Sequence, residues 1–208
     1  MHLLHYSIIL PLSLSQYVSS SPFARTQQIT LSGSTGTVSS IRDALKYSSV
    51  IPDVLDDFEA TYSVSITYPK SHESVQLGND IPVNPGSSHQ SFTLILTDPD
   101  AKSRDNPKWS EMCHWIMTNL TAPVTSATEV SMKSELVEYL PPTPPPKTGK
   151  HRYVFVLLEG QQGQALSTPK DRKHWGYGKK RHGVRDWAEE NGLSVVGANF
   201  FFAEDEEQ

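Results

Sequence analysis

Several short segments of the chain show the apolar and polar pattern of β-strands. They are residues 62–68, 92–97, 114–117, 135–139 and 153–158, followed by a last strand built from 195–196 and 200–202. Alternation places one face of a strand on the core, whereas a continuous apolar run such as 153–158 indicates burial on both faces. The connections are long and rich in proline, which favours a Greek-key arrangement over simple hairpins.

Two short helices are predicted beside these strands. Ile41, Ala44 and Leu45 share one helical face, which predicts a helix from about 40 to 47. Val184 and Trp187 also have helical spacing, which predicts a helix over 184–191. The expected fold is therefore mostly β: an antiparallel Greek-key β-sandwich with short peripheral helices.

The length of 208 residues favours a single domain. We expect residues 28–208 to form this domain, after an N-terminal extension of residues 1–27. The extension is apolar near its start but has no Lys or Arg before Arg25, so a targeting segment and a disordered extension both stay open. We expect a cytoplasmic protein, or a secretory, vacuolar or mitochondrial one if the extension is a targeting signal.

Charge and cysteine content narrow the function classes. The formal net charge of -5 disfavours nucleic acid as the main partner. Cys113 is the only cysteine, so neither an intramolecular disulfide nor a cysteine-rich metal site can form. Pro11 and the neighbouring serines interrupt the apolar start, so no transmembrane segment is expected there. We expect no cofactor and no metal.

Polar residues stand at the ends of three predicted strands. Asp98 and Asp100 follow one strand, and His114 and His151 begin two others. A carboxylate can hold an imidazole so that its other nitrogen faces outward, and two such rings would make a cradle for an anion. Tyr153 shares a strand face with His151 and can flank that hollow. The alternatives are aspartates that cap a proline turn, histidines bonded within the structure, and a tyrosine in the core.

Two other segments carry candidate binding chemistry. The basic patch Lys179–Lys180–Arg181–His182, with Arg185, could contact anionic headgroups or acidic partners, or form a solvated loop before a helix. The proline-rich segment 140–146 could bind an aromatic groove, or form a stiff wall that leads to His151.

Motifs at several separate places match one known family in order and spacing. They are LTDPDA at 96–101, SR at 103–104, CH at 113–114, PP at 144–145, Gly149, HRYVF at 151–155 and GANFF at 197–201. On these residues the chain resembles the phosphatidylethanolamine-binding proteins (PEBP family), and the resemblance covers about 39–204. The chain departs from the family pattern at Lys102, Thr143 and Phe200.

The resemblance implies a function as well as a fold. Segments 108–111, 175–178 and 187–191 look most like a fungal branch whose members inhibit serine carboxypeptidases of the carboxypeptidase Y type and can bind anionic phospholipid. It therefore implies a non-catalytic protein with a serine carboxypeptidase and a phospholipid headgroup or phosphate as partners. The family's links to Ras and kinase signalling leave a signalling scaffold as an alternative.

The resemblance also implies a small anion pocket. Its lining residues would be Asp98, Asp100, His114, Pro144, His151 and Tyr153. The same aspartates and histidines could serve a hydrolase by acid–base or metal chemistry. The sequence contains no HExxH, G-x-S-x-G or phosphate-loop motif, which weighs against that alternative.

Overall fold

The computed structural model describes residues 38–61, 64–68, 73–77, 90–120 and 135–205. The strands are β1 (Val64–Tyr68), β2 (Glu73–Leu77), β3 (Gln90–Asp98), β4 (Met112–Leu120), β5 (Glu135–Val137), β6 (His151–Gln161) and β7 (Ser194–Ala203). The helices are α1 (Val38–Tyr47), α2 (Val50–Asp53), α3 (Val184–Glu190) and the short 3₁₀ helix η2 (His174–Gly176). The predicted N-terminal extension, residues 1–27, lies outside the described residues.

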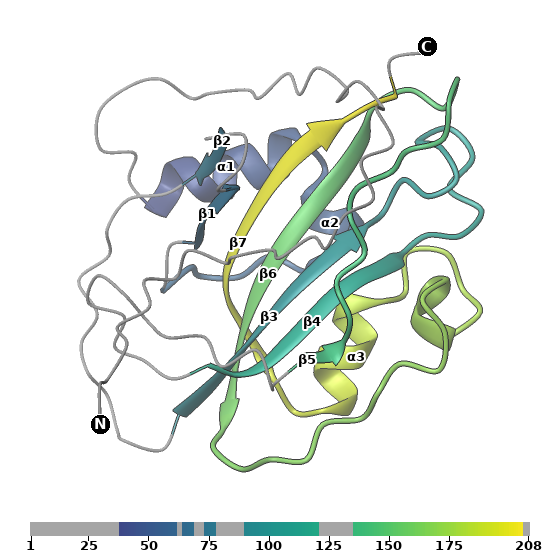
Figure 1. Cartoon of the computed structure of the whole chain (residues 1–208). Helices are drawn as coiled ribbons and strands as arrows, with labels where there is room; N and C mark the ends of the chain where they lie inside the picture. The colour runs from purple at the N-terminus through teal and green to yellow at the C-terminus, as the bar shows by residue number, and fades with distance from the viewer. Residues whose placement is uncertain (1–37, 62–63, 69–72, 78–89, 121–134, 206–208) are drawn as a thin grey trace, which may run out of the picture.

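The main sheet has Greek-key topology (Figure 1). β3, β4 and β5 are sequential neighbours, and β6 returns to pair with the free side of β3, which gives the order β5-β4-β3-β6-β7. Three consecutive strands and a fourth that returns beside the first define this motif. All pairs are antiparallel. β1 and β2 form a second antiparallel pair that contacts β7. The predicted mostly-β, antiparallel fold class is confirmed.

The main sheet is buried on both of its faces. On one face, Val154 and Val156 belong to a core cluster with residues of α1, α2 and α3. On the other face, Tyr153 and Phe155 belong to a second cluster that includes Val64 of β1. This confirms the double burial that the continuous apolar run 153–158 predicts. Successive side chains at the start of β6 therefore face alternately the helix-covered side of the sheet and the side covered by β1.

Several strands are longer than predicted, because polar residues continue them beyond the apolar run. His151 and Arg152 fall outside the apolar run, yet they pair with Ala203 and Phe202 of β7. β2 was not predicted, because its five residues include only two apolar ones, Val75 and Leu77. Within the described residues, no helix has the length and apolar character needed to cross a membrane.

Candidate functional site

His114 occupies a bulge in β4. Leu96 of β3 pairs with Trp115 and Thr97 pairs with Cys113, so the residue between them is left without a partner in the ladder. A bulge re-aims a side chain relative to the regular strand. The imidazole of His114 lies edge-on against the ring of Tyr153, with 5.2 Å between the ring centroids. The bulge therefore turns His114 toward the sheet face that carries Tyr153.

A backbone carbonyl orients the His114 ring. Its Nδ1 lies 2.9 Å from the carbonyl oxygen of Leu140. A carbonyl oxygen only accepts hydrogen bonds, so Nδ1 carries the proton. His114 is 4% exposed, and burial lowers the pKa of its imidazole. The ring is therefore neutral, and its Nε2 is a hydrogen-bond acceptor. The prediction that a carboxylate orients this ring is wrong, because the backbone carbonyl of Leu140 orients it.

Asp98 orients the second imidazole. The Nδ1 atom of His151 lies 2.9 Å from Oδ2 of Asp98, and both side chains are buried. The other carboxylate oxygen of Asp98 accepts a hydrogen bond of 2.7 Å from the backbone N–H of Asp100. The Nε2 atom of His151 lies 3.0 Å from Oγ1 of Thr148. A carboxylate thus orients His151 as expected, but the second ring nitrogen meets a hydroxyl group of the protein.

Tyr153 completes this group of side chains. Its ring stacks on that of His151, with 6.4 Å between centroids, as the shared strand face predicts. Burial and the nearby carboxylate of Asp98 raise the pKa of Tyr153, so its hydroxyl keeps its proton. Hereafter, the histidine cluster means Asp98, His114, His151 and Tyr153.

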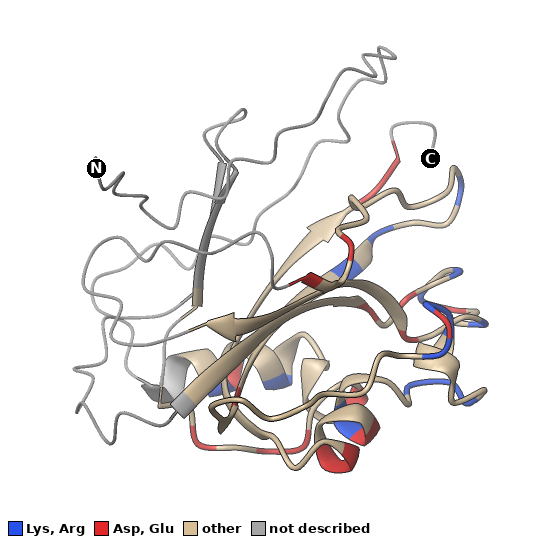
Figure 2. Cartoon of the chain, turned by 60° about the horizontal axis from the view of Figure 1, so that its bottom comes forward, with Lys and Arg blue, Asp and Glu red and all other residues tan. Residues whose placement is uncertain are grey.

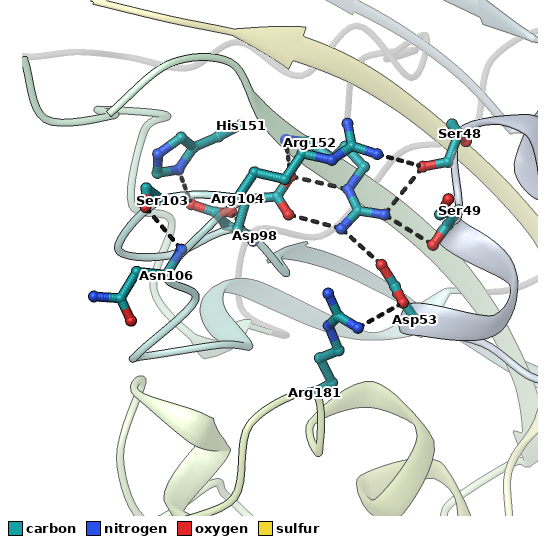
Figure 3. A network of polar contacts seen from close by, with 11 residues as sticks. Ser48, Ser49, Asp53, Asp98, Ser103, Arg104, Asn106, His151, Arg152 and Arg181 are labelled. Carbon is teal, nitrogen blue, oxygen red and sulfur yellow. Dashed lines mark hydrogen bonds and ion pairs between the residues drawn. The ribbon is translucent and has the colours of Figure 1, made fainter. Parts of the chain in front are cut away.

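Asp100 belongs to a different network, which centres on Arg152 (Figure 3). The two residues form a bidentate ion pair, with Nε and Nη2 of Arg152 at 2.9 and 2.7 Å from the two carboxylate oxygens. Arg152 is fully buried and also donates through Nη1 to the backbone carbonyls of Ser48 and Ser49. The Asp98–Asp100 turn is thereby fastened to the segment between α1 and α2.

Asp53 of α2 joins this network to the surface. One of its carboxylate oxygens lies 3.0 Å from Nη2 of Arg152, and the other lies 3.0 Å from Nη1 of Arg181. Arg181 is part of the predicted basic patch, whose Lys179 and Lys180 are exposed. Figure 2 shows Lys and Arg concentrated in the loops on the right-hand side of the view. The patch is therefore only partly free, because His182 and Arg185 are paired as well, with Asp186 and Asp56.

The structure brings four of the six predicted pocket residues together. Asp98, His114, His151 and Tyr153 form the histidine cluster, whereas Asp100 is engaged by Arg152. Pro144 is buried and precedes Pro145, whose carbonyl accepts a hydrogen bond of 2.6 Å from the hydroxyl of Thr148. Anion binding by these residues stays a prediction. Sequence reasoning missed Thr148, Arg152 and the carbonyl of Leu140.

Glu111 is a buried carboxyl group on the opposite face of the sheet. Its Oε2 accepts a hydrogen bond of 3.2 Å from the hydroxyl of Thr97. That hydroxyl in turn accepts a hydrogen bond of 3.2 Å from Nε1 of Trp175. Oε1 has no hydrogen-bond partner within the described part of the chain. Burial raises the pKa of Glu111 to about 8. No role for the Glu111 carboxyl group was predicted, because a glutamate before a strand is ordinarily exposed.

Cys113 should be chemically inert in the folded protein. It is fully buried, and burial raises the pKa of its thiol to about 12. The thiolate is the reactive form, so we expect no reaction of the native protein with Ellman's reagent at about pH 8. The same assay in denaturant is the control and should titrate the thiol of Cys113. Rapid labelling under native conditions would contradict the burial.

Comparisons with known proteins place this chain among named relatives. A family model described as phosphatidylethanolamine-binding protein matches residues 61–201. Carboxypeptidase Y inhibitor of Saccharomyces cerevisiae is 33% identical, over 78% of this chain and 94% of that protein. CEN-like protein 4 of Nicotiana tabacum is 34% identical, over 78% of this chain and 93% of that protein.

Solved structures show the same similarity. The crystal structure of carboxypeptidase Y inhibitor complexed with the cognate proteinase matches with a TM-score of 0.72 and 32% identity, over 81% of this chain and 97% of that one. A phosphatidylethanolamine-binding protein from Plasmodium vivax matches with a TM-score of 0.59 and 20% identity, over 81% and 97% of the two chains. The second match shows a shared fold.

Proposed function

Because the chain belongs to the phosphatidylethanolamine-binding protein family, we propose that it is a non-catalytic inhibitor of a serine carboxypeptidase. The similarity to carboxypeptidase Y inhibitor carries this proposal, since it extends over 94% of that protein at 33% identity. The structural match is to that inhibitor in complex with its proteinase. Similarity over almost the whole length of an inhibitor favours a conserved mode of action over reuse of the fold alone.

An inhibition assay tests the proposal directly. The full 208-residue chain would be titrated into a carboxypeptidase of the carboxypeptidase Y type, with release of the C-terminal amino acid from a blocked dipeptide as the signal. We expect inhibition that saturates near one inhibitor per enzyme. A serine endopeptidase is the control for non-specific effects and should keep its activity. Full carboxypeptidase activity at micromolar concentrations of this protein would contradict the proposal.

We further propose that the histidine cluster binds an anionic headgroup or phosphate. Tyr153 retains a hydroxyl proton and lies beside two imidazoles, which are groups that can hydrogen-bond phosphate oxygens. The cluster stands at the end of the sheet, where the loops after β3 and before β6 meet. This function is independent of peptidase inhibition, because an inhibitor does not need to bind lipid.

One observation favours hydrolysis as a second candidate. Thr148, His151 and Asp98 are arranged like a nucleophile, a base and an orienting acid, with separations of 3.0 and 2.9 Å. However, the hydroxyl of Thr148 donates its only proton to the carbonyl of Pro145, at 2.6 Å. It therefore accepts from Nε2 of His151, and that nitrogen cannot act as its base. The proton arrangement supports a binding role over a catalytic one.

A further inference from the structure

We propose that two neighbouring loops, 101–110 and 170–182, form a binding face for a short acidic segment of another protein. Hereafter, the basic face means five exposed lysines of these loops and the half-buried tryptophan among them: Lys102, Lys108, Lys173, Lys179, Lys180 and Trp109. None of these residues belongs to the histidine cluster, so the basic face is a separate site. Its ligand class is a stretch of polypeptide rich in Asp and Glu.

The two loops carry a charge opposite to that of the whole chain. They hold nine of its 18 Lys and Arg residues but only two of its 23 Asp and Glu residues, which gives the loops a formal charge of +7. The net charge of the chain is -5, so the rest of the chain carries -12. A concentrated positive charge on an acidic protein creates a local field that attracts anionic partners.

Backbone hydrogen bonds join the two loops into one surface. The N–H of His174 donates to the carbonyl of Trp109 at 3.3 Å, and the N–H of Arg181 donates to the carbonyl of Ser110 at 3.0 Å. The Nδ1 atom of His174 also lies 2.8 Å from the carbonyl oxygen of Ser110 and 3.1 Å from that of Lys179. Lysines from both loops therefore adjoin, in the region where Figure 2 shows Lys and Arg concentrated.

Trp109 holds one lysine from each loop. The Nζ atom of Lys173 lies 4.6 Å from the centroid of the Trp109 ring, and Nζ of Lys102 lies 5.8 Å from it. A cation within about 6 Å of an aromatic ring is attracted by the negative face of the ring. Both ammonium groups are thus kept near one place in the free protein. This reduces the side-chain entropy that is lost when they bind carboxylates.

The lysines of the basic face differ from the cations beside them. None of the five forms an ion pair with any residue that the structure describes. By contrast, Arg181 is paired with Asp53, and Arg185 is paired with Asp56. The five ammonium groups are therefore left to bind a partner, and carboxylates form strong, charge-assisted hydrogen bonds with them.

Acidic residues at the border of the basic face limit the size of its ligand. Asp56 lies 3.1 Å from Arg185, which follows the second loop, and Asp56 is exposed. Glu189 and Glu190 are exposed at the far end of α3, the helix that begins just after this loop. An extended polyanion such as nucleic acid would meet these carboxylates as well as the lysines. An acidic segment of a few residues would meet the lysines alone.

The basic face does not offer the side chains by which proteins enter a lipid surface. Binding at a membrane interface combines basic charge with exposed Trp, Phe or Leu side chains. Every residue of the two loops is described, and none of them has an exposed large hydrophobic side chain. Trp109 is half-buried and has two ammonium groups against its ring. The observations therefore favour an acidic polypeptide over a membrane.

Fluorescence anisotropy on the full chain tests the proposal, with octaglutamate that carries a dye of no net charge. Octaglutamine with the same dye is the uncharged control. We expect octaglutamate to bind saturably at about 0.01 M salt, where charges act over roughly 30 Å, and to dissociate at about 1 M, where they act over roughly 3 Å. No binding of octaglutamate at the lower salt concentration, or equal binding of octaglutamine, would overturn the inference.

Charge reversal locates the binding site. Lys173→Glu should weaken the binding of octaglutamate by at least about fivefold, because a cation beside the bound carboxylates is replaced by an anion. Lys147→Glu makes the same change at an exposed lysine outside the two loops, so its effect should be roughly twofold or less. Equal losses in the two variants would mean attraction by net charge alone and would contradict a defined face.

Replacing Trp109 separates a built site from a diffuse charge. Trp109→Leu keeps every charge but removes the ring that holds Lys102 and Lys173, so the affinity for octaglutamate should fall roughly threefold or more. Trp109→Phe keeps an aromatic ring and should retain most of the affinity. Thermal unfolding checks that both variants are folded. Native affinity in a folded Trp109→Leu protein would refute the inference, and the exposed lysine variants decide the question if that protein is unfolded.

Vesicles test the alternative partner. The native protein and the charge reversals Lys179→Glu and Lys180→Glu would be sedimented with vesicles of phosphatidylcholine and phosphatidylserine. We expect these reversals to weaken the binding of octaglutamate more than they weaken retention on the vesicles. The opposite order would assign the basic face to a membrane and would rule out the acidic polypeptide as its ligand.

Discussion

Replacing Arg152 with methionine is expected to lower the free energy of unfolding by about 3 to 5 kcal/mol. The arginine is fully buried and forms two hydrogen bonds to the carboxylate of Asp100, so its loss leaves a buried negative charge without compensation. The carbonyl of Ser49 loses its donor at the same time, and that of Ser48 keeps only the hydrogen bond of 3.4 Å from Arg104. Methionine fills a similar volume, so the loss reflects charge and hydrogen bonding more than a cavity.

Equilibrium unfolding in urea, extrapolated to water, measures this change. Arg42→Met is the matched control, because Arg42 forms a similar two-pronged ion pair with Asp57 at the surface, at 2.6 and 2.5 Å. Exposed pairs contribute little, so this variant should unfold at nearly the native urea concentration. If both variants behaved alike, burial would not be the reason for the importance of Arg152.

Replacing Glu111 with glutamine is expected to stabilise the protein at about pH 8, by on the order of 3 to 5 kcal/mol relative to the same change at about pH 4. The pKa of Glu111 is raised from 4.5 to about 8 by burial. Between these values the unfolded chain has released the proton and the folded chain has kept it. The folded state then binds more protons, so native stability falls as pH rises through this window. Glutamine cannot ionise and removes that slope.

Unfolding free energies of both proteins across this pH range provide the measurement. Glu189→Gln, at an exposed position of α3, is the same chemical change outside the core and should leave the pH dependence unchanged. Parallel curves for the native protein and Glu111→Gln would show that Glu111 ionises at the same pH in the folded and unfolded protein, so that burial does not raise its pKa. The hydrogen bond from Thr97 can be kept by the glutamine carbonyl, which limits the structural disturbance.

Strand positions in the main sheet follow from the hydrophobic pattern, because burial on a sheet face selects apolar residues at fixed spacing. The shared face of His151 and Tyr153 follows from the same rule. The bulge at His114 does not, since an extra residue in one strand depends on its pairing with β3 and leaves no compositional mark.

The polar networks were harder to predict than the strands. A sequence shows that Asp98 and His151 can pair, and the structure confirms it. It does not show whether Asp98 or Asp100 will form an ion pair with a buried arginine, and in the structure Arg152 pairs with Asp100. Partners such as the carbonyl of Leu140 are invisible in any side-chain pattern, because every residue has the same carbonyl. The orientation of His114 depended on such a group.

Because His114 has no partner in the ladder, its deletion would leave the pairing of β3 with β4 in register. Leu96 and Thr97 are neighbours in β3, and their partners in β4 would be neighbours too if the intervening residue were deleted. Such a shortened strand could continue its ladder without interruption and would still offer the same apolar side chains to both layers. The proposed anion binding would therefore be lost from a descendant of this gene through one in-frame codon loss, while the architecture survived intact.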